Sequence, residues 1–482
     1  MRSSVSGPTR LLLIFRRFDA HRFITAEFFV VVAFGACFAK SQSDTYWHLA
    51  AGRAMARSGQ VLLTDVFSHT NFGARWANYE WLSQVVFYQV HSLGGMPLLT
   101  AMGALLAFGS CLLAWRLMRG SAEDRVLLMA AALPLISPGW SVRPQAFTMF
   151  LLMLVAHAVV RERVWVLPPV FLLWANLHAA VALGLVVLAA DFVVAIVSGR
   201  PWARRVVTGA LAFAATLVTP LGPSLWLEVW RSLNRSRVNQ ISEWMPPVFE
   251  ARFAVFWVVA AVFAVLAVTR WRLLESHADR VLVAVSALLL VLAARTSRNV
   301  VPFALVAAPG MSRLLWRQGS LRTRASDSGA PWGGMARSAV FALSALAAVM
   351  VVQWHWTKVP ARSDWDPVSS AAAAAISSCE PPIYNHYDAG GYLIWFVPGQ
   401  PVFLDSRQDP YPPDLIRAQR EARTPEALRA LLRRYRIRCA ALEPGSFESS
   451  ALTGDGWAIR YRDARWVVMT PPPSGDSRRQ PG

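Results

Sequence analysis

The sequence predicts a polytopic α-helical membrane protein with a C-terminal extracytoplasmic α/β domain. Of its 482 residues, 55% are hydrophobic and only 16% are charged, whereas a soluble chain carries about 25% charged residues. Several apolar runs are long enough to enter a bilayer, and the tail that follows them is less apolar. These observations exclude a soluble enzyme, a disordered scaffold and a small secreted disulfide domain.

About eleven apolar segments are expected to cross the membrane, although several are shorter than the roughly 20 residues that a full crossing needs. They lie at about Phe23–Ala39, Met96–Leu117, Val126–Pro138, Ala146–Val160, Val164–His178, Ala179–Val197, Val206–Leu221, Phe253–Thr269, Val281–Ala294, Val300–Leu315 and Ala339–Trp354.

The distribution of arginine predicts the orientation of these segments. The N-terminal arm and every second loop after it hold more Arg than the opposite loops, and cytoplasmic loops collect basic residues. The N-terminus is therefore predicted to be cytoplasmic and the C-terminus to lie outside. The arginines of the cytoplasmic loops also explain the net charge of +19. Nucleic-acid binding is not indicated, because no basic run is interleaved with aromatic residues as a binding groove requires. Many of the 21 tryptophans lie at the ends of apolar runs, where they anchor a protein among membrane lipids.

The chain is expected to divide into four regions. These are a cytoplasmic arm (1–22), a transmembrane domain (23–355) with outer loops at 40–95 and 221–252, an extracytoplasmic α/β domain (356–470) and a disordered tail (471–482). Alternating apolar residues in the α/β domain predict strands and one amphipathic run predicts a helix. The strands are expected at Ile383–Tyr387, Val402–Asp405, Cys439–Leu442 and Trp466–Thr470, and the helix at Pro425–Tyr435.

Cofactor motifs are missing from the sequence. It contains no Cys-x-x-Cys, His/Cys cluster, Walker loop or Gly-x-Gly-x-x-Gly, so no metal site or nucleotide cradle is indicated. Cys379 and Cys439 both fall in the α/β domain, where a disulfide would persist. Two cysteines on neighbouring strands need not meet, and the pairing stays open.

Ionisable residues gather in the first outer loop. Residues 45–57 form an amphipathic pattern that predicts a helix lying on the membrane, started by Asp44. On such a helix Asp44 and His48 are one turn apart and share a face. Glu80 begins a second helix, Trp81–Leu93. The loop is thus expected to bring two carboxylates and an imidazole to the membrane surface. The alternative is that Asp44 only caps its helix and that Glu80 only complements a helix N-terminus.

The segment Asp44-Thr-Tyr-Trp-His48, followed by a Gly and then by an Asp and a Gly, resembles the first outer loop of oligosaccharyltransferase catalytic subunits. These belong to the GT-C superfamily of integral-membrane glycosyltransferases, with protein mannosyltransferases and aminoarabinose transferases. The layout of many spans, a long acidic first loop and a C-terminal domain is also similar. Further segments resemble uncharacterised bacterial membrane proteins. These segments are Asn78–Leu82, Arg143–Gln145, Glu243–Trp244 and Gly390–Trp395.

The resemblance implies a protein of the bacterial inner membrane that transfers a sugar, with inversion, from a polyprenyl-phosphate donor to an extracytoplasmic acceptor (protein, lipid or polysaccharide). Such chemistry needs a carboxylate for the acceptor and cations for the departing phosphate. The catalytic candidates are Asp44, Glu80 and His48. The phosphate candidates are Arg143, Arg295 and Arg298, since a guanidinium binds phosphate oxygens in a bidentate manner. The acceptor or substrate candidates are Glu243, Trp47, Asp405, Arg407 and Tyr411.

The chain departs from the oligosaccharyltransferase pattern at two places. The second outer loop, Gly139–Pro144, has no Asp-x-Asp metal pair, and the tail has Asp364-Trp-Asp366 where a Trp-Trp-Asp motif would stand. A metal-independent transfer, as in the mannosyltransferase-like members, is therefore expected, with a divalent metal as an open alternative that no motif indicates.

Two other classes of function stay open. Glu27, His157 and Asp191 lie inside predicted spans, and intramembrane charges favour a transporter or lipid flippase. Alternatively, the tail residues around Asp405 dock the tail on the spans or bind envelope material, and the chain is a non-catalytic assembly protein.

Overall fold

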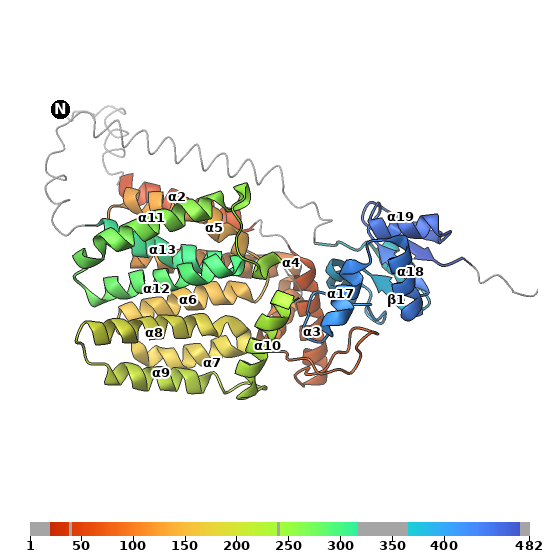
Figure 1. Cartoon of the computed structure of the whole chain (residues 1–482), viewed down its shortest axis with the longest axis horizontal. Helices are drawn as coiled ribbons and strands as arrows, with labels where there is room; N and C mark the ends of the chain where they lie inside the picture. Colours follow the sequence, from red (N-terminus) through yellow and green to blue (C-terminus); the bar gives the residue numbers. More distant parts are fainter. Residues whose placement is uncertain (1–19, 38–40, 239–241, 317–364, 473–482) are drawn as a thin grey trace, which may run out of the picture.

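The computed structural model describes residues 20–37, 41–238, 242–316 and 365–472. A bundle of helices and a C-terminal α/β domain occupy the two ends of the long axis, and residues 41–80, called the first loop, lie near their junction (Figure 1). The bundle helices are α2 (Ala20–Cys37), α4 (Trp81–Leu117), α5 (Ala122–Ile136), α6 (Gln145–Val160), α7 (Leu167–Leu177), α8 (Ala182–Val197), α9 (Ala203–Ala215), α11 (Ala254–Arg270), α12 (His277–Arg295) and α13 (Val300–Leu315).

Four helical segments in the described part of the chain are long and apolar enough to cross a bilayer, by length and composition. They are Trp81–Leu117, Ala179–Val197, Ala251–Leu273 and His277–Arg295. Other predicted spans form shorter helices, and Ala339–Trp354 lies outside the described residues. The expected count of about eleven spans is therefore not confirmed.

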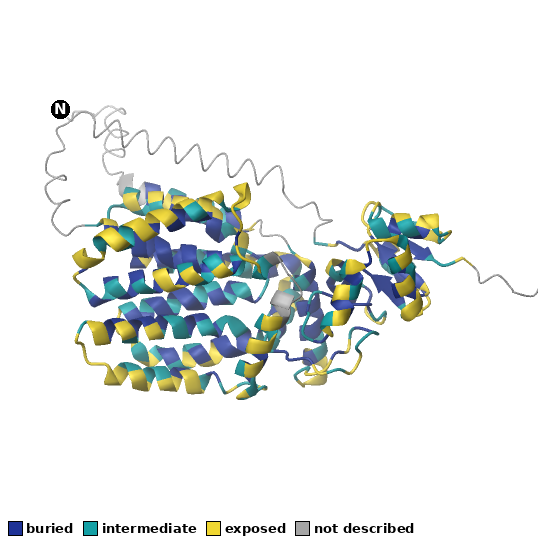
Figure 2. Cartoon of the chain, viewed as in Figure 1, coloured by how far each residue is buried: buried dark blue, intermediate teal, exposed yellow. Residues whose placement is uncertain are grey.

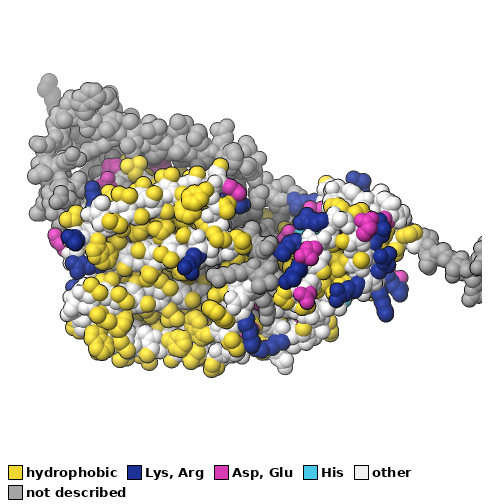
Figure 3. Space-filling view, viewed as in Figure 1, with side chains coloured by type: hydrophobic (Ala, Val, Ile, Leu, Met, Phe, Trp, Pro, Cys, Tyr) yellow, Lys and Arg dark blue, Asp and Glu magenta, His cyan; other side chains and the backbone are white. Residues whose placement is uncertain are grey.

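Apolar side chains fill the bundle interior, where the helices are largely buried (Figure 2). Hydrophobic side chains also cover the visible flank of the bundle (Figure 3). In the interior, the Phe303 ring meets Phe256 and Phe263 edge-on, with centroids 6.0 and 5.9 Å away. On the flank, Val258, Val265 and other apolar side chains are exposed. A helix that is apolar on all sides is typical of a protein surrounded by lipid.

Charged residues inside the bundle are paired. Asp191 of α8 lies 2.6 Å from His277 Nε2 and 3.0 Å from Arg205 Nε, so it joins α8 to α12 and α9. Asp279 binds Arg313 at 2.7 Å and Arg119 at 2.9 Å. Because Asp191 contacts the Arg205 guanidinium and the His277 imidazole within the bundle, its burial has a structural explanation that needs no transported ion.

The first-loop helix differs from its prediction. Helix α3 spans Ser43–Ser58, and its N-cap is Gln42 rather than Asp44, which lies in the first turn. The helix does not lie open on a membrane surface, because α4 packs on one side and α16 (Gly390–Phe396) on another. The amphipathic pattern could not identify these partners, which come from later in the chain.

Two glycines permit this close packing. A Cβ at Gly52 of α3 would lie 2.0 Å from the Gln84 carbonyl oxygen of α4, and one at Gly391 of α16 would lie 2.2 Å from the Ser43 carbonyl oxygen. The Gly391 amide also donates to Ser43 Oγ at 3.1 Å. The C-terminal domain is thus held directly against the turn of α3 that carries Asp44.

The C-terminal domain is built on a mixed four-stranded sheet. The strands are β1 (Ile383–Asn385), β2 (Cys439–Leu442), β3 (Ala458–Arg462) and β4 (Val467–Thr470). Their order is β1-β2-β4-β3, with β1 and β2 parallel and the other pairs antiparallel. The remaining helices are α15 (Ser370–Ser377), α17 (Pro413–Glu421), α18 (Pro425–Arg434) and α19 (Phe447–Gly454). Cys379 and Cys439 form a disulfide.

One predicted strand of this domain is wrong and one was missed. Residues Val402–Asp405 do not join the sheet, and Val402 instead forms an isolated bridge with Ser68 of the first loop. Strand β3 is mostly exposed, so it lacks the apolar run by which the other strands were found.

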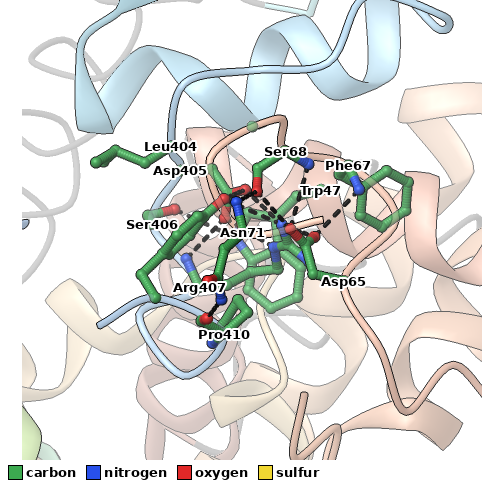
Figure 4. Close-up of polar contacts among 12 residues, drawn as sticks. Trp47, Asp65, Phe67, Ser68, Asn71, Leu404, Asp405, Ser406, Arg407 and Pro410 are labelled. Carbon is green, nitrogen blue, oxygen red and sulfur yellow. Dashed lines mark hydrogen bonds and ion pairs between the residues drawn. The ribbon is translucent and has the colours of Figure 1, made fainter. Parts of the chain in front are cut away.

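A buried charge cluster joins the first loop to the C-terminal domain (Figure 4). Arg407 Nη2 lies 2.7 Å from both Asp65 and Asp405, and all three side chains are 0% exposed. Tyr411 donates its hydroxyl to Asp405 at 2.6 Å, and the guanidinium lies over the Trp76 ring at 4.7 Å. A guanidinium between two carboxylates, with further hydrogen bonds, is the arrangement that offsets the desolvation of buried charge.

Replacing Arg407 by Met is expected to destabilise the protein by about 3–5 kcal/mol, because Asp65 and Asp405 would remain buried without a cation. Thermal unfolding of the purified protein measures the effect. The control is Arg417→Met, which removes an exposed arginine of α17. Equal melting temperatures for the two variants would contradict the assigned role of Arg407.

Gly391→Ala is expected to push α16 away from α3, because the added methyl group overlaps the Ser43 carbonyl, and overpacking of this kind costs about 1–3 kcal/mol or more. Limited proteolysis of the first loop should become faster. The control is Gly454→Ala, where a Cβ meets no atom within 4 Å. The close approach is refuted if both variants resist protease as well as the wild type does.

Candidate functional site

Asp44 is surrounded by hydrogen-bond donors from three parts of the chain. Its Oδ2 pairs with Arg143 Nε at 3.1 Å. Its Oδ1 accepts from Trp47 Nε1 at 3.3 Å and from the Ser406 hydroxyl of the C-terminal domain. The Asp44 side chain is 19% exposed. This carboxylate is therefore fixed in orientation by partners on both of its oxygens.

Arg143 precedes α6 and bridges two carboxylates. Besides Asp44 it contacts Glu243, with Nη1 at 3.2 Å and Nη2 at 3.4 Å from the two carboxylate oxygens. Its Nη1 also donates to the Gln42 side chain at 3.0 Å. Burial alone would raise the pKa of Glu243, but the Arg143 and Arg298 guanidinium groups outweigh it and hold this pKa below its ordinary value.

Glu80 lies at the N-cap of α4 between two imidazoles. Its Oε1 is 3.3 Å from His178 Nε2, and its Oε2 is 3.7 Å from His48 Nε2. Burial raises the pKa of the Glu80 carboxyl from 4.5 to about 8, against the opposing effect of Arg298. Burial and then Arg143 lower the pKa of His48 well below its ordinary value. At neutral pH the group therefore consists mainly of a protonated carboxyl and a neutral His48.

Arg298, in the turn between α12 and α13, extends toward the same group. Its Nη2 lies 3.3 Å from His178 Nε2, and its guanidinium stacks over the Trp244 ring at 5.0 Å. Among the described residues, no carboxylate lies within ion-pair distance of Arg298. Its charge is thus less neutralised by direct contact than that of Arg143, which has two carboxylate partners.

Seven of the predicted site residues meet in this cluster, which we call the junction site. They are Asp44, Trp47, His48, Glu80, Arg143, Glu243 and Arg298. Arg295 is exposed at the end of α12, and within the described residues no ion pair or hydrogen bond links it to the cluster.

The other predicted substrate residues lie in the buried charge cluster. Asp405, Arg407 and Tyr411 contact one another and Asp65 there. This arrangement favours docking of the tail over contact with a ligand.

Sequence reasoning missed two residues of the junction site. His178 was assigned to the end of an apolar span, and its only signal was an ionisable group at the break between α7 and α8. Ser406 carries no sequence signal, because a serine beside Asp405 is ordinary in a loop. Both lie far from their carboxylate partners in sequence, and only the tertiary fold brings them together.

Metal binding finds no support in the side chains that the structure describes. No group of three or more His, Cys, Asp or Glu residues there is arranged to hold a metal ion. Asp44 pairs with the Arg143 guanidinium.

Glu80→Gln is expected to change how stability depends on pH. Since the pKa of Glu80 rises from 4.5 to about 8 on folding, the folded state keeps a proton that the unfolded state loses between these values. The stability contributed by this proton is present at low pH and is lost as pH rises toward 8. The melting temperature of Glu80→Gln relative to the wild type should therefore increase from about pH 5 to about pH 8. A constant difference in melting temperature would contradict a buried, protonated Glu80.

Comparisons with known proteins were made by sequence and by structure. No protein-family model and no curated protein matches the chain. Oligosaccharyltransferase AglB of Archaeoglobus fulgidus, solved with an inhibitory peptide and a dolichol-phosphate, matches with a TM-score of 0.62 and 9% identity over 88% of this chain and 69% of its own. ArnT of Cupriavidus metallidurans matches in the apo state with a TM-score of 0.51 and 16% identity, over 96% of this chain and 98% of its own.

ArnT bound to undecaprenyl phosphate matches with a TM-score of 0.50 and 14% identity, over 94% of this chain and 98% of its own. One of these structures is an oligosaccharyltransferase that holds a dolichol-phosphate, and another holds undecaprenyl phosphate. At such low identity the likeness to this chain is one of fold. The chain therefore shares its overall fold with these solved structures.

Proposed function

We propose that the protein is a membrane glycosyltransferase that moves a sugar from a polyprenyl-phosphate donor to an extracytoplasmic acceptor with inversion at the anomeric carbon. The observation that carries the proposal is the junction site itself. Two acidic side chains, Asp44 and Glu80, and two guanidinium groups, Arg143 and Arg298, gather where the first loop meets the C-terminal domain. The GT-C fold of the chain supports the same general kind of reaction.

The reaction divides into tasks that these side chains can perform. An acceptor hydroxyl or amine attacks the anomeric carbon, and the bond from that carbon to the phosphate oxygen breaks with its electron pair on the phosphate. A phosphate leaves readily, so the site needs a group to orient and deprotonate the acceptor and a cation to stabilise the departing charge. No strong general acid is required.

Arg298 is the better cation for the phosphate. Arg143 already binds Asp44 and Glu243, so a phosphate would have to displace a carboxylate from it. Arg298 stacks on Trp244, and its hydrogen bond to a described residue goes to His178. Its other N–H groups remain for bidentate contact with phosphate oxygens. Arg143 in this view orients Asp44 instead of holding the donor, and Arg295 plays no part.

The acceptor is expected to approach from the Glu243 side. The Glu243 side chain is 45% exposed, whereas those of Asp44 and Glu80 are 19% and 16% exposed. Glu243 therefore forms the rim of the site and Glu80 its interior. In this proposal the site faces the outside of a bacterial inner membrane, with the N-terminus in the cytoplasm, as the Arg-rich alternate loops indicate.

Asp44→Asn is expected to lower turnover by about 100-fold or more, since it removes the charge that orients the acceptor at nearly constant volume. The purified protein in nanodiscs would be incubated with a panel of polyprenyl-phosphate sugars, and donor binding and product would both be measured. Donor binding should persist in the variant. The control is Asp414→Asn in the first turn of α17, on an exposed residue.

Two results would contradict the proposal. If no polyprenyl donor binds, the similarity of fold does not extend to function. A transporter or a non-catalytic assembly protein would then be the better interpretation. If a double variant with Ala at both Asp44 and Glu80 keeps full turnover, the acidic residues of the junction site are not needed for the reaction.

A further inference from the structure

We infer that Glu80 takes the proton of the acceptor and that His178 is the positioning residue that holds Glu80 for this step, while Asp44 orients the acceptor without accepting its proton. The inference rests on the proposed function and deepens it. It divides the chemistry between the two carboxyl groups that the sequence offered as catalytic candidates.

The two oxygens of Asp44 are already engaged. Oδ2 binds the Arg143 guanidinium at 3.1 Å, and Oδ1 accepts hydrogen bonds from Trp47 Nε1 and the Ser406 hydroxyl. Each oxygen of this carboxylate therefore already has a donor from the protein, which leaves fewer lone pairs to take a proton from an acceptor. It is, however, well suited to hold an acceptor group in one orientation through a remaining lone pair.

Glu80 has the opposite surroundings. Its contacts within the described residues are imidazole nitrogens rather than a guanidinium. The charged groups that face it from other elements are Arg298 and Arg143, which favour its anion, and Asp409 and Asp44, which oppose it. Burial dominates, and it places the pKa of Glu80 at about 8. A base is most effective when its pKa lies near the working pH.

His178 is held by a chain of hydrogen bonds on its other side. Trp174 Nε1 donates to Thr148 Oγ1 at 2.8 Å, and Thr148 Oγ1 lies 2.8 Å from His178 Nδ1. The hydroxyl can donate to Nδ1 or accept from it, so the contact exists in either tautomer. All three residues are buried. The imidazole plane is therefore fixed, with Nε2 aimed at Glu80 Oε1 at 3.3 Å.

The proton balance of the step is simple. The acceptor O–H or N–H bond breaks and its proton goes to the Glu80 carboxylate, while the acceptor atom bonds to the anomeric carbon. The electron pair of the broken bond to that carbon leaves on the phosphate oxygen. The proton taken up by Glu80 then leaves to solvent or to the departed phosphate. The step as written needs no oxidant.

The test is a pH–rate profile in nanodiscs with the donor that turns over best in the panel. In the wild type, kcat should rise with pH and level off above about 8. Glu80→Gln should abolish the rise and lower kcat by about 100-fold or more. His178→Gln should lower kcat by about 10-fold or more and shift the midpoint of the rise, with the KM for donor little changed. Thr148→Val should act in the same direction but more weakly.

His386→Gln is the matched control, because its ring is 47% exposed on the C-terminal domain. It should leave the profile unchanged. A pH-dependent rise that survives in Glu80→Gln, or that disappears in Asp44→Asn, would overturn the assignment of the base. A profile of His178→Gln equal to that of the wild type would overturn the positioning role.

A second measurement does not depend on turnover. The infrared band of the protonated Glu80 carboxyl, identified by its loss in Glu80→Gln, should titrate near pH 8 and move in His178→Gln. If this band behaves as expected but no donor turns over, the proposed function fails and its proton step with it. If donors turn over and Glu80→Gln remains active, only the inference fails.

Discussion

A guanidinium enclosed between two carboxylates holds the first loop and the C-terminal domain together, and the junction site depends on it. Arg407 binds Asp65 from the loop and Asp405 from the domain with no exposed side-chain surface. Ser406 directly precedes Arg407, and its hydroxyl donates a hydrogen bond to Asp44. Because the two positions are adjacent in the chain, the cluster that docks the domain also sets where Ser406 can lie. The contacts that dock the C-terminal domain therefore also position the Ser406 hydroxyl beside Asp44.

Asp44 and Glu80 are both acidic residues of the junction site, but their surroundings differ. Asp44 lies in a helix first turn, where a negative charge is favoured by the helix dipole, and it binds a guanidinium. Glu80 lies deeper, beside imidazoles that burial keeps from charging easily. The same loop thus supplies one carboxylate paired with a guanidinium and one carboxyl group whose pKa is raised by burial. Enzymes that need an acid and a base at one pH use this kind of separation.

Much of the site could be predicted from sequence, because its parts lie at element ends that have local signals. Asp44 and His48 are one helical turn apart, and Glu80 directly precedes the apolar run of α4. Arg143 lies in a short polar turn before α6. What could not be predicted is which distant residues complete the site.

The predictions that were wrong or missing have one physical cause in common. Local periodicity does not show which distant segment a residue will contact. His178 reads as the end of a span until Glu80 is placed beside it. The segment at Val402 has a strand-like pattern, but its partner is Ser68 of the first loop and not the sheet. Arg407 reads as a loop ligand until Asp65 is known to face it.

The sequence distance between Asp65 and Arg407 has a consequence for biosynthesis. The two residues are 342 positions apart, so a ribosome that adds about 5–20 residues per second needs roughly 20–70 s to make the second after the first. During this interval the Asp65 carboxylate and the polar edge of the first loop have no guanidinium partner, and they must remain hydrated or be shielded by other factors. A chain released before its last domain would lack the Ser406 hydroxyl that contacts Asp44 and the α16 amide that contacts Ser43.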